Sequence, residues 1–300
     1  MRSELVVAAL DLAWRQWIVL GVSGTSSGTD RALDHAIDLE ALICITGTLG
    51  VVDPRLEDEA LDWCVAHSQR LVSTSRLRQL RRRLDDTARH AYDRFAAHVN
   101  ATTALKTPWP TDSKLPAVRT SGKSRPPDIA HRDLVQLRLR CLFGVTARAD
   151  LLLQFLRPNL TQETYSSTSL SVAALSELGF TKPAVGEVLS DLVMAGLIER
   201  WRRSNRDYFT LSRVAALQGL LGGVLPATAP TWAWRFPIVA NLIATASDNV
   251  GKKPIVQMVA LTKTLARATS ALEFLGFKPP LPSSSQTQID HWAVTLLHSA

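Results

Sequence analysis

Four arginines and an asparagine fall within seven consecutive residues in the second half of the chain: Arg200, Arg202, Arg203, Asn205 and Arg206. A guanidinium group is planar, always charged and able to form paired hydrogen bonds with phosphate, and it also fits a narrow minor groove. Glu199 and Asp207 flank the run and offset part of its charge. The pattern favours contact with a nucleic-acid backbone. The alternative is an exposed hairpin whose outward face simply carries charge.

A β-hairpin is the element that would present these side chains. Residues 197–203, LIERWRR, alternate apolar and charged types, and residues 207–212, DYFTLS, return after the polar turn at 204–206. Alternation with a period of two around a short polar connection predicts two antiparallel strands. The arginines would then lie along one strand, at the turn and at the start of the other strand.

Three helices are predicted directly before this hairpin, at residues 149–156, 171–180 and 181–196. Ser171 opens the second helix, and Gly179 ends it at a corner that tolerates a left-handed backbone. Thr181 caps the third helix, Pro183 stands in its first turn, and Gly196 ends it. The spacing of the apolar side chains predicts one small core, formed by Leu151, Leu152, Phe155, Val172, Leu175, Leu178, Val185, Val188, Leu189 and Leu192.

Residues 171–212 resemble the winged helix-turn-helix superfamily of bacterial regulators, of the ArsR and MarR kind. The resemblance rests on the Gly turn after SVAALSEL, the TKPAV start of the next helix, the GLI that follows it, and the Arg-rich strand before DYFTL. It implies a mainly α fold. In that fold a central winged helix-turn-helix, made of three helices plus a β-hairpin wing, is flanked by N- and C-terminal helical regions.

A winged helix-turn-helix usually places its third helix in the DNA major groove. The resemblance therefore implies that five residues face base edges: Thr181, Lys182, Ala184, Gly186 and Ser190. The third helix also carries Glu187 and Asp191, so the basic charge for phosphate contact has to come from the hairpin. On this interpretation the protein is a DNA-binding transcriptional regulator. It binds double-stranded DNA as a homodimer and represses its own or a neighbouring operon.

The longer layout is also similar to bacterial winged-helix proteins that are encoded beside minimal nucleotidyltransferases, among them antitoxins of the AbiE type. The shared features are an acidic helical front, the segment RLRCLFGVTARADLL at 138–152 and a Trp-rich helical tail. AbiE-type antitoxins carry their winged helix near the N-terminus, whereas here it is central. This resemblance implies an alternative function, that of an antitoxin or protein-interaction module that binds a partner such as a nucleotidyltransferase toxin.

The net charge of +7 is spread unevenly along the chain. Residues 1–69 hold four arginines against eleven acidic residues, whereas residues 70–105 hold eight arginines against three aspartates. Apolar spacing predicts helices at 3–22, 38–52 and 57–69 and one long basic helix at 73–99. The arginines at the start of the basic helix either contact phosphate or contact the acidic front: Arg76, Arg78, Arg81, Arg82 and Arg83.

A length of 300 residues suggests two or three domains. A Pro-rich basic linker, 105–130, separates an N-terminal helical domain, 1–104, from the winged domain, 131–222. A C-terminal helical region, 223–300, follows and contains predicted helices at 232–247, at 254–276 and close to the end. Its aromatic residues serve as core, as a dimer or partner surface, or as the lining of a ligand pocket.

Sequence patterns for several other functions are absent. There is no GxSxG, HExxH, Walker A or GxGxxG motif, so neither an enzyme nor a cofactor is predicted. The three cysteines, Cys44, Cys64 and Cys141, are far apart and lie in apolar helical patterns, which predicts buried, reduced thiols and no metal site. Asp11 and Arg15 interrupt the apolar first helix and no cleavage site follows. We therefore expect a cytoplasmic protein without a signal peptide or membrane span.

Overall fold

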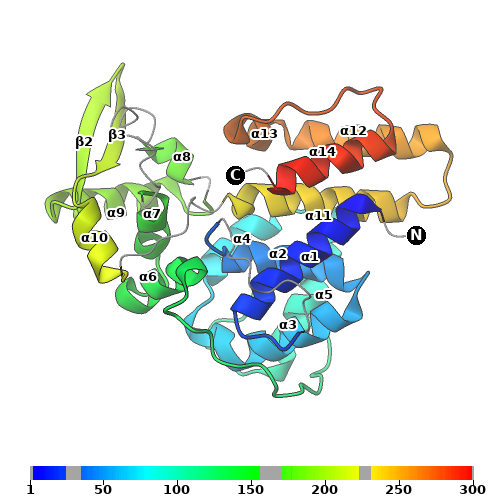
Figure 1. The fold of residues 1–300 in the computed structure, drawn as a ribbon, viewed down its shortest axis with the longest axis horizontal. Helices are drawn as coiled ribbons and strands as arrows, with labels where there is room; N and C mark the ends of the chain where they lie inside the picture. Colours follow the sequence, from blue (N-terminus) through cyan, green and yellow to red (C-terminus); the bar gives the residue numbers. More distant parts are fainter. Residues whose placement is uncertain (1–2, 25–34, 156–169, 177, 223–230, 299–300) are drawn as a thin grey trace.

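The computed structural model describes residues 3–24, 35–155, 170–176, 178–222 and 231–298. Over these residues the chain is mainly helical and carries one small antiparallel sheet (Figure 1). Figure 1 shows the sheet and its neighbouring helices at one end of the molecule and the remaining helices packed together at the other. No helix of the described ranges is long and apolar enough to cross a membrane.

A completely buried helix, α2 (Leu39–Gly50), lies at the centre of the helical body. Five of the described helices pack against it: α1 (Glu4–Val19), α3 (Pro54–His67), α4 (Thr74–Arg81), α5 (Asp86–Thr102) and α11 (Trp232–Asp248). The Ser3 and Asp38 side chains accept hydrogen bonds from backbone N–H groups in the first turns of α1 and α2. Pro54 takes the first position of α3, where its missing N–H has no helical partner to lose. The three helices predicted for the acidic front are confirmed.

The prediction of one basic helix over 73–99 is wrong, because the structure has two helices there. Ser73 caps α4 (Thr74–Arg81), and Asp85 caps α5 by accepting a hydrogen bond from Ala88 N–H at 3.0 Å. Asn241 of α11 holds the turn between them, since its amide accepts from Asp85 N–H at 2.8 Å and donates to the Arg83 carbonyl at 2.9 Å. This tertiary contact stabilises the break between α4 and α5, although the spacing of apolar residues over 73–99 predicts one continuous helix.

The Pro-rich segment 103–128 contains no helix and follows the surface of the N-terminal helices. Trp109 N–H donates to Asn100 Oδ1 at 2.8 Å, and Ser124 N–H donates to Asp62 Oδ2 at 2.9 Å. Arg125 N–H donates to the Gly21 carbonyl at 2.8 Å. The segment is extended, and hydrogen bonds attach it at intervals to the helices before it.

Five buried charged residues join the helical front to the helices that follow the linker. We call them the buried cluster: Asp38, Glu40, Arg76, Arg140 and Asp150. The Arg76 guanidinium donates to Asp38 and to Glu40, at 2.7 Å in each case. Arg140 donates to Glu40 at 2.6 Å and to Asp150 at 2.8 Å. Each of the five side chains therefore has an oppositely charged partner.

The buried cluster contains three carboxylates and two guanidinium groups, and their pKa values respond to this imbalance. Burial by itself would raise the pKa of Glu40, but Arg140 and Arg76 on either side lower it below the usual value. Burial raises the pKa of Asp150, and the Glu40 and Asp38 carboxylates raise it further, against the attraction of the two arginines. The pKa values of the two carboxyls thus shift in opposite directions, with burial as the largest cause for Asp150.

Four helices and the sheet form the end of the molecule away from the helical body. The helices are α6 (Val135–Phe143), α7 (Ala147–Phe155), α8 (Val172–Ser176) and α9 (Lys182–Met194). The sheet order is β1-β3-β2, with β1 (Leu170–Ser171), β2 (Ile198–Arg203) and β3 (Arg206–Leu211) all antiparallel. A further helix, α10 (Val214–Leu220), follows the sheet.

The predicted three-helix core is largely confirmed: eight of its ten apolar residues are buried, and Val172 and Val188 are partly buried. Gly179 has φ +101°, a backbone conformation that residues with a Cβ atom rarely adopt, so this conformation favours glycine; a Cβ there would also lie close to the Arg76 side chain, at 3.2 Å. Ser171 lies in β1 and pairs with Tyr208, which corrects its predicted role as a helix start. Residue 156 of the predicted first helix lies outside the described residues.

The C-terminal helices pack back against the helical body. Besides α11 they are α12 (Pro254–Arg267), α13 (Thr269–Leu275) and α14 (Gln286–His298), and α14 contacts α1. The prediction of a single helix over 254–276 is wrong. The Thr269 hydroxyl donates to the Ala266 carbonyl at 2.8 Å, a local bond of the kind that competes with helix continuation. Trp232 is buried and stacks on Phe236, so these aromatics are core.

Candidate nucleic-acid interface

The hairpin β2–β3 projects from the end of the molecule and turns through two residues (Figure 1). Ser204 and Asn205 have φ values of +45° and +66°. Positive φ at both central residues is typical of a type I′ turn, whose twist matches that of the flanking strands. The predicted hairpin is confirmed, and its turn is one residue shorter than the 204–206 segment assigned to it.

The two faces of the hairpin differ in character. Ile198 pairs with Leu211 and Arg200 pairs with Phe209, so these residues share one face, where the apolar members are buried. On the other face Trp201 pairs with Tyr208, and their rings stack with centroids 4.9 Å apart. The period-two alternation found in the sequence thus separates a core-facing side from a partly exposed aromatic side.

All four arginines of the hairpin are exposed. Arg203 and Arg206 lie directly opposite each other across the two strands, on the face that carries the aromatic pair. Like charges in such a cross-strand pair repel each other and destabilise the hairpin. An anion bound beside them would relieve this repulsion, so this pair is the strongest indication of an anionic partner.

Arg200 and Arg202 lie on the opposite face from the Arg203–Arg206 pair. The Arg202 guanidinium donates to Asn205 Oδ1 at 2.6 Å, a bond that holds both side chains at the tip. Arg200 lines an open groove of about 880 Å³ between the hairpin and the end of α9, together with Met194 and Arg213. The predicted residues are therefore divided between the two faces and do not form one cluster.

The predicted base-contacting helix corresponds to α9. The Thr181 hydroxyl caps it by accepting from Ala184 N–H at 3.5 Å, and Pro183 stands in its first turn. Thr181, Lys182 and Ser190 are exposed, whereas Ala184 and Gly186 are partly buried. The Ser190 hydroxyl donates to the Gly186 carbonyl at 2.9 Å. Four of the five residues lie on α9 and Thr181 caps it, so all five belong to the element next to the hairpin.

Arg148 of α7 changes the charge of this surface, and sequence reasoning did not select it. Its guanidinium forms an ion pair with Asp191 of α9 at 2.6 Å. One of the two acidic side chains that made α9 look unsuited to DNA is thereby paired. Arg148 stands in the first turn of α7, one residue before the helix predicted at 149–156, and no pattern in the sequence indicated its pairing with Asp191, 43 residues further along.

The arginines of the α4 region divide between structural and exposed positions. Arg76 is buried against Asp38 and Glu40, which favours the predicted contact with the acidic front for this residue. Arg81 forms ion pairs with Asp93 and with Asp112. Arg78 and Arg82 are exposed. The region therefore offers no continuous row of free arginines for phosphate.

Other kinds of site find little support in the described ranges. No group of three or more His, Cys, Asp or Glu side chains there could hold a metal ion. Cys44 and Cys64 are buried, as predicted, and burial raises the pKa of both thiols well above the usual value, which keeps them protonated and unreactive. The same prediction is wrong for Cys141, which is exposed. Neither a protein-family model, nor a curated protein, nor a solved structure matches the chain.

Proposed function

We propose that residues 147–212 form a winged helix-turn-helix that binds double-stranded DNA, and that the protein is a transcriptional repressor of its own or a neighbouring operon. The observation that carries the proposal is the projecting hairpin with four exposed arginines beside a capped, partly exposed helix. In this proposal Arg203 and Arg206 contact phosphates or a narrow minor groove. The exposed side of α9, with Thr181, Lys182 and Ser190, faces base edges in the major groove.

The order of elements supports the winged helix-turn-helix. α7, α8 and α9 precede the hairpin, Gly179 stands at the corner between α8 and α9, and β1 ties the start of α8 to β3. The Arg148–Asp191 ion pair reduces the negative charge on α9. A homodimer completes the proposal, because two-fold symmetry would match a palindromic operator.

The test is a DNA-binding titration of the full chain against duplex DNA from upstream of its own gene. Fluorescence anisotropy measures the binding at several salt concentrations. Replacing Arg202, Arg203 and Arg206 by alanine should weaken binding about 10-fold or more for specific and unrelated duplexes alike. The same change should lower the slope of log Kd against log salt by up to about three, since each lost phosphate contact removes about one released counterion.

The matched control removes the same charge elsewhere, through Lys114→Ala, Arg119→Ala and Lys253→Ala, all at exposed positions. This variant should keep the wild-type affinity and salt slope. Equal affinity of wild type and the hairpin variant for the upstream DNA would refute the role of the hairpin. Equal weakening by both variants would show that net charge alone determines binding.

A second candidate function is a protein-interaction module, such as an antitoxin that binds a nucleotidyltransferase. The groove at the end of α9 favours it, because Met194 at its edge is 81% exposed and a flexible apolar side chain suits a protein surface. Co-purification of the wild type with the product of an adjacent gene, and its loss in Met194→Glu, would support this function over DNA binding.

A further inference from the structure

The outer face of the hairpin carries an aromatic pair, Trp201 and Tyr208, that lies outside the protein core. The buried side chains of the three strands all share the opposite face: Leu170, Ile198, Phe209 and Leu211. Within the described part of the chain, neither ring of the aromatic pair packs against the hydrophobic core. The pair therefore points away from the protein interior.

The rings of the aromatic pair lie nearly parallel. Their centroids are 4.9 Å apart and their planes differ by 20°. Both side chains are partly exposed. Covering apolar ring surface is favourable, and aromatic rings prefer offset stacks. A flat partner that continues the stack would cover surface that the folded chain leaves in contact with water.

Positive charge borders the aromatic pair on the side of the turn. Arg203 and Arg206 form the next cross-strand pair on the same face, about 7 Å further along the strands. Neither guanidinium has an ion-pair partner among the described residues. Glu199 is the one acidic residue of the hairpin on this face, and it lies on the other side of the rings. Tryptophan, tyrosine and arginine are also common in protein interfaces, but two juxtaposed arginines favour a polyanion.

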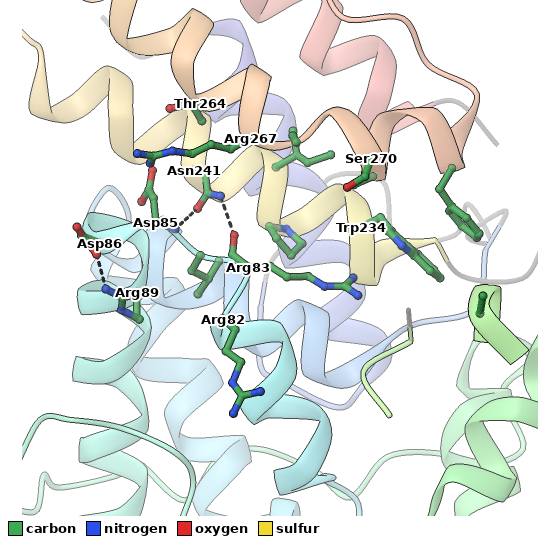
Figure 2. A pocket seen from close by; sticks show the side chains of 17 residues that line it. Arg82, Arg83, Asp85, Asp86, Arg89, Trp234, Asn241, Thr264, Arg267 and Ser270 are labelled. Atoms are coloured by element: carbon green, nitrogen blue, oxygen red, sulfur yellow. Dashed lines mark hydrogen bonds and ion pairs between the residues drawn. The ribbon is translucent and has the colours of Figure 1, made fainter. Parts of the chain in front are cut away.

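A second aromatic stack lies beside an arginine elsewhere in the molecule, but there the protein itself supplies the contacts. It occupies one end of a cleft of about 830 Å³ where the α4–α5 turn meets α11 and the α12–α13 pair (Figure 2). Trp234 is buried and stacks on Phe274, and Arg83 lies over the Trp234 ring at 5.8 Å. The Arg83 guanidinium donates to the Ala233 carbonyl at 2.9 Å. In the described part of the chain, the arginines beside the aromatic pair of the hairpin have no comparable internal partner.

We propose that the aromatic pair stacks on unpaired nucleobases, so that the hairpin binds DNA best where a duplex adjoins a single-stranded stretch. The inference rests on the proposed contact between the hairpin and DNA. Unpaired bases lie against Trp201 and Tyr208, and Arg203 and Arg206 contact the neighbouring phosphates. Every base has a flat π face, so this contact adds affinity without reading sequence. A fully paired duplex does not offer it, because its bases are already stacked on one another.

The experiment compares three DNAs that share the duplex from upstream of the gene, with fluorescence anisotropy of the full chain at one salt concentration. The first is the duplex alone, the second carries a single-stranded extension of about five nucleotides, and the third carries the same extension with abasic sites. The extension with bases should bind about 10-fold more tightly than the abasic extension. Both have the same phosphates, and only the former can stack.

The ratio of these two Kd values is the readout, because a general loss of binding cancels in it. Trp201→Leu and Tyr208→Leu should each bring the ratio close to one, and Trp201→Phe, which keeps a ring, should retain most of it. Phe274→Leu is the matched control, since it removes an aromatic ring that is 39% exposed and lies outside the hairpin. It should keep the wild-type ratio. Circular dichroism confirms that each variant is folded.

The outcomes separate this inference from the proposed function. Equal affinity of the wild type for the two extensions, with binding to the duplex retained, would overturn the inference and favour a protein partner for the aromatic pair. A ratio that Trp201→Leu leaves intact, or that Phe274→Leu lowers equally, would also overturn it. Binding to none of the three DNAs would refute the DNA contact and this inference together. Binding that needs the unpaired bases, with none to the duplex alone, would refute the double-stranded site and support this one.

Discussion

The buried cluster and the hairpin are both rich in arginine, yet they use it in opposite ways. In the cluster Arg76 and Arg140 are at most 2% exposed, and each donates to two carboxylates. On the hairpin Arg203 faces Arg206, and all four arginines are exposed. The difference shows that the role of an arginine depends on which charged side chains the tertiary structure places next to it. The number of arginines in a stretch of sequence does not reveal that role.

The largest expected effect tests this contrast with the same substitution at two positions. Arg140→Met should lower the free energy of unfolding by about 3–5 kcal/mol, because it leaves Glu40 and Asp150 buried with one fewer cation. Arg200→Met on the hairpin should change it by no more than about 0.5 kcal/mol. Urea unfolding followed by circular dichroism measures both. Similar losses for the two variants would contradict the contrast.

A pH series sharpens the account of the buried cluster. The pKa of Glu40 is lowered in the folded state, so its ionised form adds stability above the unfolded pKa, and this stability is lost as pH falls through the folded pKa. The destabilisation caused by Glu40→Gln should therefore be greatest near pH 7 and shrink on acidification. Urea unfolding at intervals from about pH 4 to 7 measures this trend.

Asp150 should show the reverse trend, because its pKa is raised in the folded state. Protonation then favours the folded protein, so its contribution grows as pH falls and is lost as pH rises through the folded pKa. Asp150→Asn should accordingly cost less than Glu40→Gln at pH 7, and its cost should increase on acidification. If the loss of unfolding free energy varied with pH in the same way in the two variants, the opposite pKa shifts of Glu40 and Asp150 would be contradicted.

The smallest expected effect concerns the turn of the hairpin. Ser204 holds a φ of +45°, which is unfavourable for a residue with a Cβ atom. Ser204→Gly should stabilise the hairpin by no more than about 1 kcal/mol, and Ser204→Val should destabilise it. Hydrogen exchange of the β2 and β3 amides measures both. Identical protection in the two variants would argue against a type I′ turn.

Sequence patterns predicted the local elements of this protein well wherever neighbouring residues determine them. The cap at Thr181, the Gly179 corner and the alternation around the hairpin are all local signals, and each is confirmed. The predictions of single helices over 73–99 and 254–276 are wrong. In the first case Asn241, far away in the chain, stabilises the break.

For the candidate interface, the sequence identified the residue types and their helix and strand. It did not predict that Arg203 and Arg206 share a face with Trp201 and Tyr208, because that depends on the hairpin register. It also missed the pairing of Arg148 with Asp191.

The amino-acid sequence by itself determined where most of the helical segments and the hairpin lie, which side chains of them are apolar, and that the hairpin carries a dense group of arginines. These properties depend on the spacing of residues along one element. The tertiary structure decided which charges are paired and buried, which stay exposed, and where the α4–α5 turn, α11 and the α12–α13 pair enclose a cleft. Those properties depend on the distances between residues far apart in the chain, and only packing sets those distances.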